Sequence, residues 1–132
     1  MELGSEEKSY IREHAGEGYE LLKELAQIPA PSNHEERRTE FCKNWLEKNG
    51  AKGVYVDSAG NVVYPHHVTA TNPVIVFMAH MDVVFPDETP LPWKEEGGRL
   101  CCPGVGDDTA NLVALLLSAR YVAERDLKPS DG

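Results

Sequence analysis

The sequence has few basic residues for its length. Its 132 residues include 13 Lys and Arg against 22 Asp and Glu, which gives a net charge of −9 at pH 7. Nucleic acids and anionic membrane surfaces are bound through basic patches. The one adjacent basic pair, Arg37-Arg38, lies among glutamates and indicates a solvated helix face. We therefore expect neither a nucleic acid nor a membrane as a partner.

Cysteines and long apolar runs are also scarce. There are three cysteines, two of them adjacent, and such a set does not form a framework of disulfides. The N-terminal residues lack the apolar core of a signal peptide. No run approaches the roughly 20 apolar residues that span a bilayer. We expect a reduced, cytoplasmic protein, and its 41% hydrophobic residues suffice for one packed domain.

The chain does contain clear helical patterns. Apolar residues recur at helical spacing in three stretches, which cover residues 6–28, 32–48 and 109–125. Pro29-Ala30-Pro31 ends the first stretch. Ser32 and Glu35 have the spacing of a capping box, which predicts that Ser32 caps the second helix.

Strand patterns lie between these helices. Turn residues predict one hairpin over residues 54–64 and a second around Gly97-Gly98. The unbroken apolar run 73–78 predicts a strand that is covered on both faces. Residues 129–132, Pro-Ser-Asp-Gly, have the composition of a loop that leads to a further parallel strand. We therefore expect a fragment of a larger sheet.

Reactive side chains follow directly after the run 73–78. A neutral imidazole such as that of His80 is a good zinc ligand, and its second nitrogen usually donates to a carboxylate. In an extended segment, residues i and i+2 point the same way. Asp82 is therefore placed to orient His80. The alternative is a histidine that ends a strand and bonds to the backbone.

A second acidic cluster, Asp107-Asp108, opens the predicted helix 109–125. An aspartate at this position is also a common N-cap, which is the alternative reading. A cap alone does not explain two adjacent aspartates after Gly104-Val105-Gly106, a segment that allows a close approach of the backbone. The helix N-terminus would keep both carboxylates ionised, as metal ligands must be.

Other polar pairs have simpler interpretations. The adjacent histidines His66-His67 form a motif of low specificity, and we expect them to face solvent. We expect Cys101-Cys102 to pack in the core and Glu95-Glu96 to lie at a solvated hairpin tip. Trp93 either lines a substrate cleft or packs against its own loop.

Three motifs together resemble one family. The segments 79–86 and 103–110 resemble the metal-site motifs of the dinuclear zinc peptidase and amidohydrolase family, which includes peptidase T, glutamate carboxypeptidase, carnosinase and aminoacylase. Residues 25–32 resemble its N-terminal signature. The resemblance implies an α/β fold, a partial three-layer sandwich with helices packed on a mixed sheet. Residues 1–132 would form the N-terminal segment of the catalytic domain and would be incomplete without the rest.

The resemblance also implies roles for individual residues. His80 would ligate one zinc ion, Asp107 would bridge two, and Asp82 would orient His80 in the catalytic site. Asp108 would follow Asp107 through a cis peptide. A complete site would hold two Zn²⁺ ions, with cobalt or manganese as alternatives. Thr109 stands where many members have lysine, which leaves the subfamily open.

The resemblance predicts zinc-dependent, exopeptidase-like hydrolysis of the amide bond of a small peptide or an N-acyl amino acid. The family's general base is a glutamate of a Glu-Glu pair, and neither that pair nor the remaining ligands lie in this chain. The chain would thus supply only part of the site. We expect the ligating atoms of His80 and Asp107 to converge to about 4–5 Å, a separation that a shared zinc ion would bridge.

Two alternatives stay open at this point. The chain is a non-catalytic fragment or short form that associates with a complementing chain, or with copies of itself as a homo-oligomer. Otherwise it belongs to a different class of hydrolase, in which Asp107-Asp108 hold magnesium for phosphate esters. The second alternative has less support, because no phosphate-binding Gly-rich loop with lysine is present.

Overall fold

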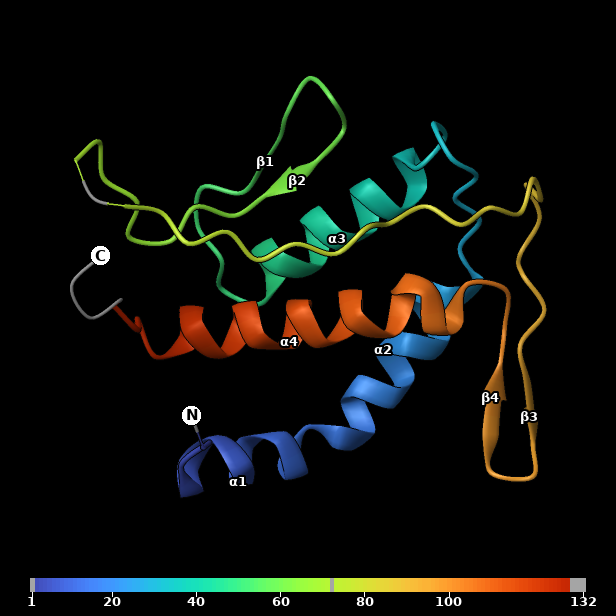
Figure 1. The fold of residues 1–132 in the computed structure, drawn as a ribbon, viewed down its shortest axis with the longest axis horizontal. Coiled ribbons are helices and arrows are strands. Elements are labelled where there is room, and N and C mark those ends of the chain that lie inside the picture. Colours follow the sequence, from blue (N-terminus) through green and yellow to red (C-terminus); the bar gives the residue numbers. More distant parts are fainter. Residues whose placement is uncertain (1, 72, 129–132) are drawn as a thin grey trace.

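The computed structural model describes residues 2–71 and 73–128. In this part of the chain, three helices are followed by four short strands and then by a π-helical turn and a final helix (Figure 1). The elements in chain order are α1 (Ser5–Glu13), α2 (Ala15–Gln27), α3 (Glu36–Lys48), β1 (Tyr55–Val56), β2 (Val62–Val63), β3 (Lys94–Glu96), β4 (Arg99–Cys101), the π-helical turn η1 (Val105–Thr109) and α4 (Ala110–Glu124). Both helices and strands are present, as an α/β fold requires. The described helices include none that is both long and apolar enough to cross a membrane.

The first predicted helix, 6–28, is divided in two. His14 separates α1 from α2 and has non-helical dihedral angles, φ −102° and ψ 5°. Gly16 and Gly18 follow directly, and glycine weakens helical preference by about 1 kcal/mol relative to alanine. The chain changes direction at this point (Figure 1). The apolar pattern therefore located the helical residues but not the break between them.

The hydrophobic core lies where α2, α3 and α4 meet. α4 contacts both other helices and runs between them (Figure 1). The buried cluster consists mainly of Leu21, Leu25, Cys42, Leu46, Leu112, Val113 and Leu116. Each fully buried leucine stabilises the fold by about 1.5–3 kcal/mol relative to an exposed one. This core fixes the N-terminal end of α4, where Asp107-Asp108 lie.

Both predicted hairpins are confirmed. β1 pairs with β2 in an antiparallel register that places Tyr55 opposite Val63. β3 pairs with β4, and the turn between them consists of Gly97 and Gly98, with φ of +58° and +75°. Glycine is favoured at both positions because a side chain is strained at positive φ.

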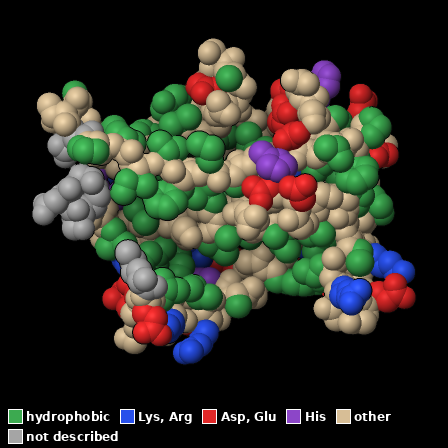
Figure 2. Space-filling view, in the orientation of Figure 1, with side chains coloured by type: hydrophobic (Ala, Val, Ile, Leu, Met, Phe, Trp, Pro, Cys, Tyr) green, Lys and Arg blue, Asp and Glu red, His purple; other side chains and the backbone are tan. Residues whose placement is uncertain are grey.

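The predicted strand 73–78 is wrong. The segment is extended but forms no ladder with another strand among the described residues. Its apolar side chains are exposed, from 55% at Val74 to 82% at Met78. Figure 2 shows hydrophobic side chains gathered on the face that this segment crosses. An unbroken apolar run indicates only that the side chains are suited to burial. A strand also needs a neighbouring strand with which its backbone forms hydrogen bonds, and the sequence pattern does not show whether one is present.

The predicted capping box is also wrong. α3 begins at Glu36 with Glu35 as its N-cap, and no side chain caps it. The Ser32 hydroxyl instead donates to Asp82 Oδ2 at 2.6 Å. An isolated parallel bridge between Pro31 and Val83 holds the two segments side by side. The residues after α2 therefore support the segment that carries His80 and Asp82. The predicted loop 129–132 lies outside the described residues.

Candidate metal centre

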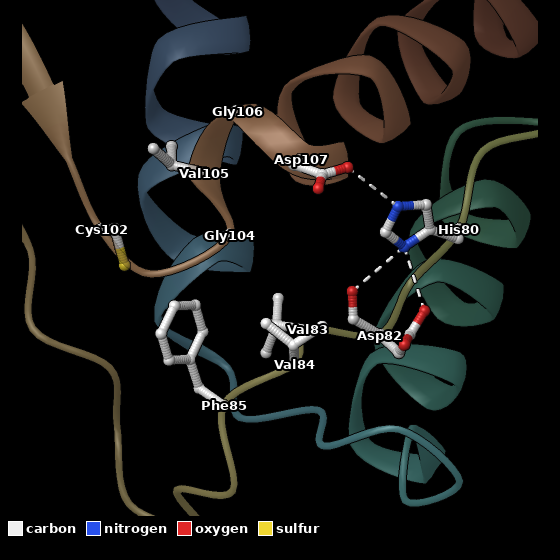
Figure 3. A pocket seen from close by; sticks show the side chains of 10 residues that line it. All are labelled: His80, Asp82, Val83, Val84, Phe85, Cys102, Gly104, Val105, Gly106 and Asp107. Atoms are coloured by element: carbon white, nitrogen blue, oxygen red, sulfur yellow. Dashed lines mark hydrogen bonds and ion pairs between the residues drawn. The ribbon is translucent and has the colours of Figure 1, made fainter.

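His80 and Asp82 lie at the end of the extended segment and face one another (Figure 3). His80 Nδ1 is 3.0 Å from Asp82 Oδ1 and 3.1 Å from the Asp82 carbonyl oxygen. The second carboxylate oxygen of Asp82 accepts the hydrogen bond from Ser32. This bond, together with the nearby imidazole, lowers the pKa of Asp82 although partial burial opposes it. The carboxylate is therefore held ionised in one orientation.

Asp107 approaches His80 from the opposite side (Figure 3). His80 Nε2 lies 3.3 Å from Asp107 Oδ1. We expected a separation of about 4–5 Å, which was too long: zinc–ligand distances of about 2.0–2.2 Å at a tetrahedral angle place two ligating atoms about 3.3–3.6 Å apart. The observed separation therefore fits the two atoms to one shared cation. The Asp107 side chain is 95% exposed, so its lone pairs are accessible.

The imidazole of His80 thus contacts a carboxylate at each nitrogen. Burial lowers the pKa of His80, but the hydrogen bond to Asp107 and the negative charge of Asp82 outweigh it, and the pKa is raised. The site therefore attracts positive charge to the position between Nε2 and Oδ1. An imidazole nitrogen beside a carboxylate oxygen is a donor pair that zinc prefers.

Asp108 makes different contacts from those of Asp107. The peptide bond between them is cis, as the resemblance implied. Asp108 Oδ2 accepts a hydrogen bond from the backbone N–H of His80 at 3.3 Å. Its other oxygen accepts one from the Asn111 side chain. Asp108 therefore fastens the backbone of His80 to the start of α4, while Asp107 faces the imidazole.

The close approach expected at Gly104 is confirmed. Gly104 has φ +72°, and a Cβ atom built there would lie 2.2 Å from Val83 Cγ1. Val83 is only 2% exposed. Because a side chain at residue 104 would displace Val83, glycine allows η1 to pack directly against the segment that follows Asp82.

A buried arginine supports both halves of the centre, and the sequence interpretation missed it. Arg38 is fully buried rather than solvated. It donates to the carbonyl oxygen of Met81 at 2.9 Å and to Thr109 Oγ1 at 3.1 Å. Further donors reach the carbonyl oxygens of Ala26 and Ile28. Arg38 thus ties α2, α3, the His80 segment and η1 together.

A signal for the burial of Arg38 was present in the sequence. Arg38 precedes Cys42 by four residues and Leu46 by eight, so all three lie on one face of α3. Cys42 and Leu46 are 1% and 6% exposed. The neighbouring glutamates indicated that Arg38 lies on a solvated face of the helix. Its spacing from Cys42 and Leu46 indicated the core instead, and this second indication was correct.

The candidate centre opens into a pocket of about 370 Å³. His80, Asp82 and Asp107 lie at one side, and Val84, Phe85 and Val105 line the other (Figure 3). Pockets for small molecules typically have about 300–1,000 Å³ and combine apolar walls with a few polar groups. The space beside the carboxylates is thus large enough for an amino acid derivative.

Of the remaining candidates, Cys102 lines this pocket. Trp93 does not line this pocket: its Nε1 donates to Glu95 and its ring meets Tyr19 edge-on. Cys102 is partly buried and donates to the Ala26 carbonyl, whereas Cys101 is exposed. Neither belongs to the core cluster of the described residues, so the expectation that both pack in the core is wrong.

Comparison with known proteins agrees with the motifs. Residues 76–131 match the model of peptidase family M20/M25/M40. This segment contains His80, Asp82 and Asp107-Asp108. The match supports a fragment of this peptidase family, and it confirms the resemblance of the motifs to a peptidase and amidohydrolase family.

A particular relative extends the likeness beyond that segment. The chain is 35% identical over 102 residues to a protein of Pyrococcus abyssi (strain GE5 / Orsay) named "Putative LysW-lysine/LysW-ornithine hydrolase". The aligned region covers 77% of this chain and 28% of that relative. The chain thus spans little more than a quarter of the length of the curated relative it matches.

Proposed function

We propose that this chain supplies part of the dinuclear zinc centre of an enzyme that hydrolyses the amide bond of a peptide or an N-acyl amino acid. The observation that carries the proposal is the position of His80 between two carboxylates, with Nδ1 at Asp82 and Nε2 at Asp107. The match of residues 76–131 to a peptidase family supports the reaction class. The named hydrolase relative supports a substrate that contains an amino acid.

His80 Nε2 and Asp107 Oδ1 would hold the cation. Bound zinc would polarise the substrate carbonyl and lower the pKa of a nearby water. Zinc is the natural choice for this donor pair, and cobalt or manganese would also be accepted. Catalytic zinc usually has three protein ligands. The other ligands and the general base would therefore be residues other than His80 and Asp107.

Asp82 would set the state of the imidazole. By accepting a hydrogen bond from Nδ1–H, it would leave the lone pair on Nε2 free for a cation beside Asp107. Ser32 holds Asp82 in this position at 2.6 Å. The apolar wall formed by Phe85 and Val105 would contact the side chain of the substrate and exclude water from that side of the pocket.

The exposed segment 73–78 fits the same proposal. Five consecutive apolar side chains, Val74 to Met78, are exposed. We propose that this segment becomes a buried strand of a larger sheet in the complete catalytic domain, as a three-layer sandwich would require. Cytoplasmic location remains a prediction from composition.

The test is Asp82→Asn in the protein that contains this chain. Asparagine keeps the size of the side chain but weakens its hold on the Nδ1 proton, and loss of such an orienting group typically costs about 10–100-fold in metal affinity or activity. Zinc affinity and hydrolysis of N-acyl amino acids and dipeptides would be measured together. Asp87→Asn, at an exposed position in the following loop, is the matched control. Unchanged zinc affinity and activity in Asp82→Asn would contradict the proposal.

A second function is favoured by the exposed apolar segment. A non-catalytic short form could associate with a partner chain through residues 74–78, because an unpaired extended segment is a template for strand addition. Ile75→Lys, at a side chain 66% exposed, should then convert an assembly into a monomer. Sedimentation velocity would measure this, with Val68→Lys as a control at another exposed apolar position. A wild-type monomer that binds zinc weakly would contradict this second function.

A further inference from the structure

A second group of metal-ligating side chains lies at the far end of α4. His66 and His67 meet Asp126, although the two segments are about 60 residues apart in the sequence. α4 begins beside Asp107-Asp108 and ends two residues before Asp126. At a rise of about 1.5 Å per residue, its length separates the two groups by about 22 Å. The cluster is therefore independent of the candidate metal centre.

We propose that His66, His67 and Asp126 form a binding site for a divalent cation of the zinc class. Each residue offers one ligand atom, and the three atoms lie within 4.8 Å of one another. His67 Nε2 is 2.7 Å from Asp126 Oδ1. A set of two imidazoles and one carboxylate is typical of zinc sites and disfavours magnesium or calcium, which prefer oxygen alone.

A fourth donor is in place. The carbonyl oxygen of Leu127 lies 2.7 Å from His66 Nε2. Ligands of one zinc ion stand about 3.3–3.6 Å apart. The two hydrogen-bonded pairs would therefore open by less than 1 Å as a cation replaces the shared protons. The side chains of His67 and Asp126 are 31% and 72% exposed, so little packing opposes this movement.

The surroundings of His66 permit both the free and the bound state. Tyr64 Oη lies 2.9 Å from His66 Nδ1. Without a cation, Nε2 donates to the Leu127 carbonyl and the Tyr64 hydroxyl donates to Nδ1. With a cation on Nε2, the proton moves to Nδ1, which then donates to Tyr64 Oη. Metal-ligating histidines usually have such an acceptor at their other nitrogen. Neither state leaves a polar group without its partner.

The electrostatics also favour a cation at this position. The C-terminal end of α4 presents partly negative carbonyl groups. The net charge of the chain is −9. A bound cation would clamp the loop that contains His66 and His67 to the end of α4.

Backbone conformation determines which variants test the site. His67 has φ +50° and Asp126 has φ +46°. Asparagine tolerates this left-handed region better than most residues. His67→Asn and Asp126→Asn therefore remove a ligand without adding backbone strain. His34→Asn, at another exposed histidine, is the control for the loss of an imidazole.

The experiment is carried out on the chain with His80→Ala, so that the candidate metal centre does not compete. Zn²⁺ is titrated calorimetrically, and Co²⁺ is titrated by visible absorption. We expect one cation per chain, intense d–d bands of a four-coordinate Co²⁺ site and a Zn²⁺-dependent rise in melting temperature. His67→Asn and Asp126→Asn should each weaken Zn²⁺ binding at least tenfold, while His34→Asn leaves it unchanged.

Two results would overturn the proposal. The first is Zn²⁺ binding in the His80→Ala chain that His67→Asn does not weaken. The second is the absence of binding in that chain while circular dichroism shows that it is folded. In that case, the three side chains form only an ion pair and a helix C-cap. Neither result bears on the hydrolysis measured with Asp82→Asn, because that activity depends on the other centre.

Discussion

Two arginines, Arg38 and Arg120, are buried among the described residues, and their guanidinium groups bind different kinds of partner. Arg38 and Arg120 are 0% and 5% exposed. Arg120 binds the carboxylate of Glu17 and the hydroxyl of Tyr10. Arg38 binds three carbonyl oxygens and the hydroxyl of Thr109, and no carboxylate pairs with it in the part of the chain that the structure describes.

The pKa values of the two arginines shift in opposite directions. Burial lowers the pKa of Arg38, and no strong partner compensates. Burial also lowers the pKa of Arg120, but the hydrogen bonds to Glu17 and Tyr10 outweigh it, and the pKa is raised. Arg120 fastens helices to one another through charge. Arg38 fastens backbone segments whose positions determine the candidate metal centre, so its geometry matters more than its charge.

The largest effect should come from Arg38→Met. The carbonyl oxygens of Ala26, Ile28 and Met81 would lose their buried donor, and each unsatisfied group costs about 1–3 kcal/mol. We expect a loss of about 3–5 kcal/mol in the free energy of unfolding, measured by urea denaturation. Arg37→Met, at the exposed neighbouring arginine, should change it by less than about 0.5 kcal/mol.

Cysteine labelling gives a local readout of the same change. Cys42 lies one turn after Arg38 on α3, and burial raises the pKa of its thiol to about 12. Cys42 should therefore resist alkylation in the wild type and react faster in Arg38→Met, with the exposed Cys101 as the internal reference. Equal urea midpoints and equal labelling rates in Arg37→Met and Arg38→Met would show that Arg38 does not hold these segments together.

Arg120→Met should have a smaller effect on stability and no effect on the candidate centre. It removes the bonds to Tyr10 and Glu17 and the stacking of Arg120 on Trp45. However, Arg120 Nη2 is a buried donor for which the described residues provide no partner. The variant relieves this desolvation, so we expect a net loss of about 1–2 kcal/mol. Zinc affinity should match the wild type, and a reduced affinity would remove the contrast with Arg38.

The comparison also shows what the sequence could and could not predict. Three of the helical regions and both hairpins followed from local patterns, because periodicity and turn residues act over a few neighbours. His80, Asp82 and Asp107 were singled out because two short motifs carry them. The burial of Arg38 could have been read from its helical spacing to Cys42 and Leu46, but its partners could not, because they lie 10 to 71 residues away and no local pattern records such a relation. The strand at 73–78 failed for the same reason, since pairing depends on a distant segment.

Thr109→Val tests the link between Arg38 and the acidic turn. Thr109 is fully buried, accepts from Arg38 and donates to the carbonyl oxygen of Gly104 at 3.0 Å. Valine has the same shape but makes neither bond, so we expect a loss of about 1–2 kcal/mol. Thr109→Ser keeps the hydroxyl and should retain zinc affinity at Asp107. If Thr109→Val and Arg38→Met were strictly additive, the bond between them would not contribute to stability.

The smallest effect should come from Glu17→Gln, which weakens the charge pairing of Arg120. The hydrogen bond and charge of Arg120 lower the pKa of Glu17 below its ordinary value of 4.5. A group with a lowered folded-state pKa stabilises the protein above its unfolded-state pKa and loses that contribution as the pH falls through the folded-state pKa. The Glu17 side chain is 45% exposed, so solvent screening limits the contribution to a few tenths of a kcal/mol up to about 1 kcal/mol.

The stability difference between wild type and Glu17→Gln should therefore be present at neutral pH and disappear in acid. Urea midpoints measured from about pH 7 to about pH 3 would resolve it. Glu24→Gln, on the same helix, is the control for the loss of one negative charge. If the stability difference between wild type and Glu17→Gln persisted unchanged in acid, Arg120 would be held by packing and by its contact with the Tyr10 hydroxyl, and its charge pairing with Glu17 would not contribute. The two buried arginines would then depend on geometry in the same way, and the contrast in charge between them would have no energetic consequence.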